Sequence, residues 1–286
     1  MSNRQAREVV HQVRGYRAKD GAGVSLVRVL GQETLRQYSP ILMLDSFDST
    51  DPMEYTAGFP MHPHRGIETI SYVYKGRMEH RDSIGHSDTI GDGEVQWMTA
   101  GSGILHEERI PAAERLLGVQ LWLNLPAKDK MAGPAYYSLK KDSIPEVSID
   151  GGYVRILAGD FEEIKGFQSR YQPLDYYDVH VEAGRTVILP VRAGYEALAF
   201  TLLGAAEIGG TAVGEKTAVK LSAGDHLIIK AGEKPAQVLV AAAAPLEEPV
   251  AWGGPIVMNT RDELQTAFDE LRSGTFLREG VDYDEA

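Results

Sequence analysis

The chain has 286 residues and carries 29 basic against 41 acidic side chains, a formal net charge of −12 at pH 7. This balance disfavours direct nucleic-acid binding, which needs a basic face, and we expect Lys128, Lys130, Lys140 and Lys141 to be solvated loop charges. The absence of cysteine excludes disulfides and thiolate metal ligands. Because no signal segment and no apolar run of about 20 residues is present, we expect a cytoplasmic protein without membrane association.

Short β-rich runs separated by glycine turns fill the first half of the chain. Turns are predicted at Lys75-Gly76 and Asp92-Gly93. The strands predicted around them are 67–74, 77–82, 94–98 and 116–125. Many strands with glycine turns between them indicate an all-β sandwich or barrel.

The second half repeats this rhythm. The run 195–203 meets Gly204 as the run 67–74 meets Gly76, and this alignment places Pro190 on His62 and Arg192 on His64. Aligning Pro245 with Pro111 places Val240 on His106 and Ala242 on Glu108. The sequence therefore predicts two barrels, 1–135 and 136–286, of which the second lacks the polar residues of the first.

A helix is predicted near the C-terminus. Thr260 and Glu263 have the spacing of a capping box, and Ser273-Gly274 ends the pattern. Between them, apolar residues recur at helical spacing at Leu264, Ala267, Phe268 and Leu271. The helix is predicted to be structural, and the acidic tail from Arg278 to Ala286 to serve solubility.

Two short motifs in the first half predict a metal site. His62 and His64 are two residues apart, and so are His106 and Glu108. Residues at this spacing in a strand point to one face, so both pairs can aim at one point. Three imidazoles and one carboxylate suit Fe(II), Mn(II), Ni(II), Cu(II) or Zn(II) better than Ca²⁺ or Mg²⁺. The alternative is that each histidine is an ordinary hydrogen-bonded residue.

Glu68 is the competing carboxylate. If one regular strand continued through it, residues 62, 64, 66 and 68 would share a face. Glu68 would then lie about 13 Å along the strand from His64, whereas Glu108 is only two residues from His106. This geometry favours Glu108 as the ligand. It leaves Glu68 as a residue that supports a ligand or as a wall of the pocket, and it directs Glu107 away from the metal. His80 and His86, on the next hairpin, could be solvated or line the pocket rim.

The spacing from Gly58 through His62 and His64 to Glu68 resembles the first motif of cupins, and Gly101-Ser-Gly103-Ile-Leu-His106 resembles the second. Within the cupins, the runs 60–69, 96–108, 120–125 and 254–260 resemble the pirin family. The resemblance implies an all-β bicupin with two antiparallel jelly-roll barrels and a short C-terminal helix. It also implies one metal, most often Fe(II), held in the N-terminal barrel by His62, His64, His106 and Glu108.

Two functions follow from the resemblance. Some pirin-like proteins are quercetin 2,3-dioxygenases, in which a flavonol and O₂ react beside the metal and carbon monoxide is released. Glu108 would then also act as the catalytic base for the flavonol 3-hydroxyl. Eukaryotic members are metal-dependent partners of transcription regulators, so the alternative is a regulatory binding protein that controls a transcription factor or a metabolic enzyme. An open coordination position favours the enzyme.

Overall fold

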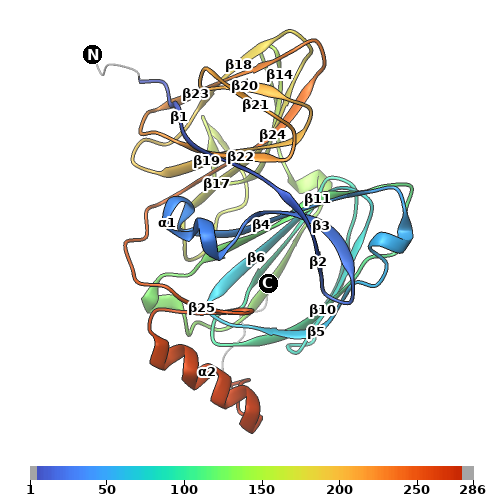
Figure 1. Ribbon diagram of the computed structural model, residues 1–286, viewed down its shortest axis with the longest axis vertical. Helices are drawn as coiled ribbons and strands as arrows, with labels where there is room; N and C mark the ends of the chain where they lie inside the picture. The colour runs from blue at the N-terminus through green and yellow to red at the C-terminus, as the bar shows by residue number, and fades with distance from the viewer. Residues whose placement is uncertain (1–4, 279–286) are drawn as a thin grey trace. The chain divides into compact units, whose positions relative to one another are not determined.

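The structure, a computed structural model, describes residues 5–278, so the predicted acidic tail beyond Arg278 lies outside the described residues. The chain forms two compact units from interleaved segments (Figure 1). The first unit contains Arg17–Leu26, Met43–Lys141 and the chain from Leu246 on, and the second unit contains the rest. The division between the units falls inside the strands β2, β3 and β4.

The first unit combines a large and a small sheet. The large sheet has the spatial order β12 (Ala135–Leu139), β9 (Glu94–Thr99), β6 (Ile67–Lys75), β11 (Leu116–Asn124), β4 (Ile41–Ser49), β3 (Val24–Leu30) and β2 (Tyr16–Asp20). The small sheet has the order β5 (Phe59–His64), β10 (Ile104–Arg109), β7 (Met78–Asp82) and β8 (Ser87–Ile90). Side chains from both sheets, among them Val73 and Met78, share one buried apolar cluster. The 3₁₀ turns η2 (Pro52–Glu54), η3 (Ala127–Asp129) and η4 (Lys141–Ser143) lie in connecting segments.

The second unit repeats this arrangement, except that its edge strand β1 (Val9–Arg14) precedes the other strands of the sheet in the chain, whereas β12 follows them in the first unit. Its large sheet runs β1, β22 (Thr217–Leu221), β19 (Glu196–Leu203), β24 (Ala236–Ala243), β17 (Leu174–Val181), β14 (Gly152–Ala158) and β13 (Glu146–Ile149). Its small sheet runs β18 (Thr186–Pro190), β23 (His226–Ala231), β20 (Ala206–Ile208) and β21 (Thr211–Val213). The pair β15 (Asp160–Phe161) and β16 (Ile164–Lys165), the turn η1 (Gln32–Thr34) and the short helix α1 (Leu35–Tyr38) complete it.

The predicted all-β fold with antiparallel pairing and a C-terminal helix is confirmed. The division into units differs from two consecutive domains, 1–135 and 136–286. The strand β12 begins at that predicted boundary but pairs with β9 of the first unit. The chain from Leu246 on also returns to the first unit, where it forms β25 (Ala251–Gly253), β26 (Ile256–Met258) and α2 (Arg261–Ser273). Among the described helices, none is long and apolar enough to cross a membrane.

The helix α2 has the predicted capping box. The Thr260 hydroxyl accepts from the Glu263 amide at 3.2 Å, and the Thr260 amide donates to the Glu263 carboxylate at 3.0 Å. Gly274 ends the helix in the left-handed conformation, with φ of 75°. The apolar face of α2 packs on β26, and Leu105 of β10 belongs to the same cluster. In Figure 1, α2 lies beside β25 at the C-terminal end of the chain.

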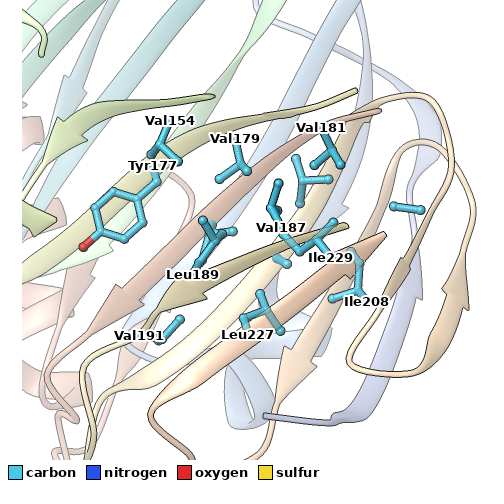
Figure 2. Close-up of a cluster of buried hydrophobic side chains, with 14 of the residues drawn as sticks. Val154, Tyr177, Val179, Val181, Val187, Leu189, Val191, Ile208, Leu227 and Ile229 are labelled. Atoms are coloured by element: carbon cyan, nitrogen blue, oxygen red, sulfur yellow. The ribbon is translucent and has the colours of Figure 1, made fainter. Parts of the chain in front are cut away.

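The interior of the second unit is apolar. In Figure 2, Val187 and Leu189 of β18 and their cross-strand partners Ile229 and Leu227 of β23 lie on one face of the small sheet, with valines of β17 beside them. Leu189 pairs with Leu227 in the position where His62 pairs with His106 in the first unit. Among residues 5–278, the one group of three or more side chains placed to share a metal ion lies in the first unit. The second unit therefore keeps the fold and fills its interior with hydrocarbon.

The strand pairing corrects both sequence alignments. The first is off by one residue at β18, where Leu189 and not Pro190 is the counterpart of His62. Aligning Pro245 with Pro111 makes β24 the counterpart of β10, and so places Val240 on His106. In the structure β23 pairs with β18 as β10 pairs with β5, whereas β24 lies between β17 and β19 as β11 lies between β4 and β6. The counterpart of β10 is therefore β23. The similar sequences that flank Pro111 and Pro245 therefore do not mark equivalent strands, because the hydrogen-bonded register places them in different sheets.

A single truncation in the second unit tests whether its interior is structural only. Leu227 is fully buried, so Leu227→Ala should lower the free energy of unfolding by about 2–5 kcal/mol through lost transfer energy and a cavity. The metal content should stay at one ion per chain. Urea unfolding and elemental analysis measure the two quantities.

Ile228→Ala is the matched control, since its side chain is on the opposite face of β23 and only half-buried. It should change stability far less. A Leu227→Ala protein that folds as stably as the wild type, or that loses its metal, would contradict this assignment.

Candidate metal centre

Three predicted histidines meet between β5 and β10. The two strands pair antiparallel with His62 opposite His106, and His64 follows on the same face as His62. Their ligand nitrogens all lie within 4.8 Å of one another. The ring centroids are 4.4 Å apart for His62 and His106, and 5.0 Å for His64 and His106. The structure thus brings together the three imidazoles that the sequence pattern singled out.

Two backbone carbonyls set the tautomers of the β5 histidines. The Nδ1 atom of His62 is 2.8 Å from the Pro60 oxygen, and Nδ1 of His64 is 3.1 Å from the Pro255 oxygen. A carbonyl oxygen only accepts, so each neutral ring carries its proton on Nδ1 and a lone pair on Nε2. The two Nε2 atoms are 3.0 Å apart. Two facing lone pairs at this distance repel each other unless a cation lies between or beside them.

The third histidine points the same way. Nε2 of His106 is buried and has no hydrogen-bond partner. A buried polar atom without a partner is costly, and such an atom within a histidine cluster indicates a missing ligand. The donor set therefore fits a divalent transition metal held through three Nε2 atoms.

Burial keeps two of the rings, those of His64 and His106, neutral. The pKa of His64 is lowered to about 3, first by burial and then by the neighbouring His62. Burial, followed by the proximity of His64, also holds the pKa of His106 well below its usual range. Neutral imidazole is the form that binds a metal, so these two rings can bind one at pH 7 without losing protons.

Glu108 is buried on the same face of β10 as His106, but two glutamines hold its carboxylate. Gln96 Nε2 donates to Oε1 at 2.7 Å, and Gln120 Nε2 donates to both oxygens at 3.1 and 3.0 Å. The Ser71 hydroxyl lies 3.5 Å from Oε1. These contacts bridge the small sheet to β9, β11 and β6 of the large sheet. Glu108 is not part of the group whose ligand atoms lie within 4.8 Å of one another, which holds only the three histidines among the described residues.

Glu68 does not line the site, contrary to the prediction that it forms a pocket wall. β5 ends at His64, and Gly66 turns the chain with φ of 78° before β6 begins. A Cβ on Gly66 would lie 1.9 Å from the Val257 oxygen, so only glycine fits this turn. Ser71, which faces Glu108, is three residues from Glu68 on β6, so Glu68 points to the opposite face of the sheet.

Glu107 follows its prediction. Its carboxylate lies 3.3 Å from the Arg109 guanidinium, on the face of β10 opposite His106 and Glu108. It is therefore directed away from the histidine cluster.

Aromatic rings form one wall of the site. Trp122 meets the His64 ring edge-on with centroids 5.0 Å apart, and Trp252 lies 5.9 Å from Trp122. The Trp122 indole donates to the Gln120 Oε1 atom at 3.2 Å. Trp122 is buried and contacts the His64 ring.

Gln96, Gln120 and Ser71 were not anticipated from the sequence. The sequence did contain one indication of these residues. Residues with polar atoms, Gln120, Trp122 and Asn124, occupy every second position of β11, a strand that is buried throughout. Polar residues at that period in a buried strand indicate a polar interior face. His80 was left between a solvated turn and the pocket rim, and it is buried beside His106.

Lys130 was predicted to be a solvated loop charge and is buried. Its Nζ donates to the oxygens of Gly66 and Val257 at 2.8 and 2.9 Å, and to Asn124 Oδ1 at 2.6 Å. Burial lowers the pKa of Lys130 to about 7. The prediction was wrong because the C-terminal segment, distant in sequence, covers this loop.

Arg65 connects the histidine strand to the C-terminal segment. It donates to the Ser102 oxygen at 2.6 Å, to Glu270 of α2 at 2.6 Å and to the Phe276 oxygen at 2.8 Å. Its guanidinium also lies 4.1 Å from the centre of the Phe276 ring. The segment after β26 is therefore fastened to the residue next to His64.

The site predicts the outcome of ligand removal. His62→Ala, His64→Ala or His106→Ala should each abolish binding that survives dialysis, because two imidazoles leave a weak site. Elemental analysis after dialysis measures this. Glu68→Gln serves as the control and should retain one ion per chain, and its loss of metal with His106→Ala unaffected would show that the wrong residues are assigned.

Glu68 should also give the protein a distinctive pH dependence. Burial raises its pKa to about 7 from a value of 4.5, despite a hydrogen bond from Thr99. The folded state then binds the proton more tightly, so its stabilising effect is complete below pH 4.5 and is lost as pH rises through 7. The loss amounts to roughly 3 kcal/mol at most.

Glu68→Gln, which cannot ionise, should remove this part of the dependence. Denaturant unfolding of the metal-free protein between pH 4.5 and 8 measures it, the lower limit being the reference pKa. Equal pH profiles for the variant and the wild type would contradict the assignment.

Two family models match the chain. The model described as Pirin covers residues 23–123, and the model described as Pirin C-terminal cupin domain covers residues 176–277. A pirin-like protein of Caulobacter vibrioides is 40% identical, over 94% of this chain and 99% of its own length. A Pseudomonas aeruginosa protein named "Putative quercetin 2,3-dioxygenase PA3240" is 37% identical, over 94% of this chain and 97% of its own.

Solved structures agree with these matches. A quercetin 2,3-dioxygenase from Acinetobacter baumannii superposes with a TM-score of 0.88 at 33% identity, covering 95% of this chain and 99% of the other. The bacterial pirin YhhW from Escherichia coli, solved in complex with nickel(II), has a TM-score of 0.66 at 20% identity, over 82% and 99% of the two chains, and supports the fold. With both halves matched and the two-barrel cupin fold shared, the chain belongs to the pirin family.

Proposed function

We propose that this chain is a metal-dependent dioxygenase that opens the flavonol ring of quercetin-like substrates. The main support is the convergence of three imidazoles on one point, two of them buried, with Nε2 of His106 lacking any partner. In the net reaction both atoms of O₂ enter the ring-opened product, and carbon 3 of the flavonol leaves as carbon monoxide. The similarity to the quercetin 2,3-dioxygenase of Acinetobacter baumannii supports this substrate class.

The metal would be held by His62, His64 and His106, with Glu108 as the fourth ligand. We propose Fe(II), while Mn(II), Ni(II), Cu(II) and Zn(II) suit the same donors. Nickel in the structure of the bacterial pirin YhhW supports a site open to several divalent ions. When bound, the ion supplies an electrophilic position for an ionised substrate oxygen and for O₂.

Glu108 has a second proposed role as the base for the flavonol 3-hydroxyl. Its carboxylate is buried, and the amide groups of Gln96 and Gln120 fix its orientation. A carboxylate held in this way can accept a proton within the pocket without help from solvent. The two glutamines thereby position the base, while Trp122 covers one side of the histidine cluster.

The second candidate is a regulator whose surface depends on the metal state. The favouring observation is the connection from the site to the C-terminal segment. The Pro255 oxygen accepts from His64, and Arg65 binds both Glu270 and Phe276. Metal binding at the site would shift the position of α2 and so alter a surface of this chain that a partner protein recognises. The complete donor set and the buried carboxylate favour the enzyme.

Substrate analogues test the proposed activity. Metal-loaded protein should consume quercetin and other flavonols under air, whereas flavones without a 3-hydroxyl should not react. Only the flavonol offers Glu108 a proton and the metal an ionised oxygen. Loss of substrate absorbance with detection of carbon monoxide measures turnover. Metal-loaded protein that is inert toward flavonols with every divalent ion named above would favour the regulator.

Substitution of the proposed base is a separate test. Glu108→Gln should retain the three histidines and bind the metal more weakly, and it should lower turnover by about 100-fold or more, because an amide cannot accept the proton. Glu107→Gln is the matched control on the outer face of β10 and should leave turnover unchanged. Full activity of Glu108→Gln at saturating metal would contradict the role.

A further inference from the structure

Two buried polar residues on β7 have no part in the function proposed above. His80 and Asp82 lie on the strand that flanks β10 on the side opposite β5. Asp82 is directly across from His106, and His80 is across from Glu108. Both are buried and share one face of β7. The pair therefore lies next to the proposed ligands without being part of the ligand group.

The Asp82 carboxylate contacts two backbone amides and two imidazoles, the more distant of which is His86, with its Nδ1 atom 3.5 Å from Oδ2. Its Oδ1 atom accepts from the backbone amides of Ile84 and His86, both at 3.0 Å. Its Oδ2 atom lies 2.8 Å from Nε2 of His80. An ionised carboxylate only accepts, so Nε2 of His80 must carry a proton. The turn at 82–86 thus fixes one carboxylate oxygen with two amides and aims the other at an imidazole.

This proton places a lone pair at the other end of the His80 ring. In the neutral ring Nδ1 is then an acceptor, and it lies 3.4 Å from Nδ1 of His106. His106 can satisfy that contact only by carrying its own proton on Nδ1. Its lone pair is then on Nε2, the buried atom without a partner. Tyr136 stacks on His80 with centroids 4.2 Å apart and planes inclined by 15°, which holds the His80 ring in place.

We propose that Asp82 and His80 form a positioning relay that fixes the tautomer of His106 and thereby sets the metal affinity of the site. The inference rests on the proposed function, since it assigns a role toward the same metal. His62 and His64 take their tautomers from backbone carbonyls, whereas His106 takes its tautomer from side chains. Of the three ligands, His106 is therefore the one whose orientation can be changed by substitution elsewhere.

Asp82→Asn is the most informative variant because it preserves shape. The backbone amides of Ile84 and His86 can donate only to the oxygen of the asparagine side chain. The NH₂ group of that side chain therefore faces His80. His80 must then accept at Nε2 and donate from Nδ1. That reverses the proton on His106 and places it on Nε2, toward the metal. His80→Phe removes the relay in a different way, while keeping an aromatic ring against Tyr136.

The test measures Co(II) affinity by chelator competition, the visible spectrum of the Co(II)-loaded protein and the Tm of the metal-free protein. Asp82→Asn and His80→Phe should each bind Co(II) about 10- to 100-fold more weakly than the wild type. Their metal-free Tm should stay near that of the wild type. Glu79→Gln, which removes a charge from the other face of β7, is the matched control and should bind Co(II) like the wild type.

The outcomes separate the two proposals. Affinities of Asp82→Asn and His80→Phe equal to that of the wild type would overturn the relay and leave the dioxygenase proposal intact. Equal losses of affinity in Glu79→Gln would also overturn it, since the effect would then be one of net charge. Wild-type protein that binds Co(II) tightly but is inert toward quercetin when loaded with each of Fe(II), Mn(II), Ni(II), Cu(II) and Zn(II) would overturn the activity but not the relay. Failure of the wild type to bind Co(II) would overturn both.

Discussion

Three imidazoles whose ligand nitrogens lie within 4.8 Å of one another, two of them buried, are unfavourable unless a cation satisfies their lone pairs, and much of the first unit is arranged around this constraint. Each ring is held from behind, His62 and His64 by carbonyl oxygens and His106 by His80. These contacts turn the three Nε2 atoms inward. The backbone register of β5 and β10 therefore holds the three nitrogen lone pairs close together, and a bound ion would remove the repulsion between them.

The same fold appears twice in the chain with different interiors. In the first unit the facing sheets carry polar groups, and Glu108 joins them through Gln96 and Gln120. In the second unit, Leu189 and Leu227 occupy the corresponding cross-strand pair within a cluster of valines, leucines and isoleucines. An apolar interior contributes stability through burial, whereas a polar one must satisfy every donor and acceptor. The second unit thus contributes stability, whereas the first unit carries the polar groups of the metal site.

The histidine positions could be predicted from the sequence because period-two spacing is a local property of a strand. The helix α2 could be predicted for the same reason, since its capping box spans only four residues, Thr260 to Glu263. Residues whose role depends on register could not. Gln96 and Gln120 reach Glu108 only because β9, β6 and β11 pair as they do, and Lys130 is buried only because the segment around Val257 returns over it. Glu68 was placed wrongly because the turn at Gly66 breaks the strand that the spacing argument assumed to be continuous.

We expect the chain to bind one metal ion through the Nε2 atoms of His62, His64 and His106. X-ray absorption at the cobalt edge of the Co(II)-loaded protein tests this expectation most directly, because imidazole ligands give a characteristic multiple-scattering pattern. We expect about three imidazole nitrogens at roughly 2.0–2.1 Å from the cobalt ion, the range of metal–imidazole bonds, with oxygen atoms at the remaining positions. We also expect that the imidazole contribution falls in any His106→Ala protein forced to bind cobalt at high concentration. A shell of oxygen atoms without imidazole scattering, or a spectrum unchanged in His106→Ala, would contradict the account.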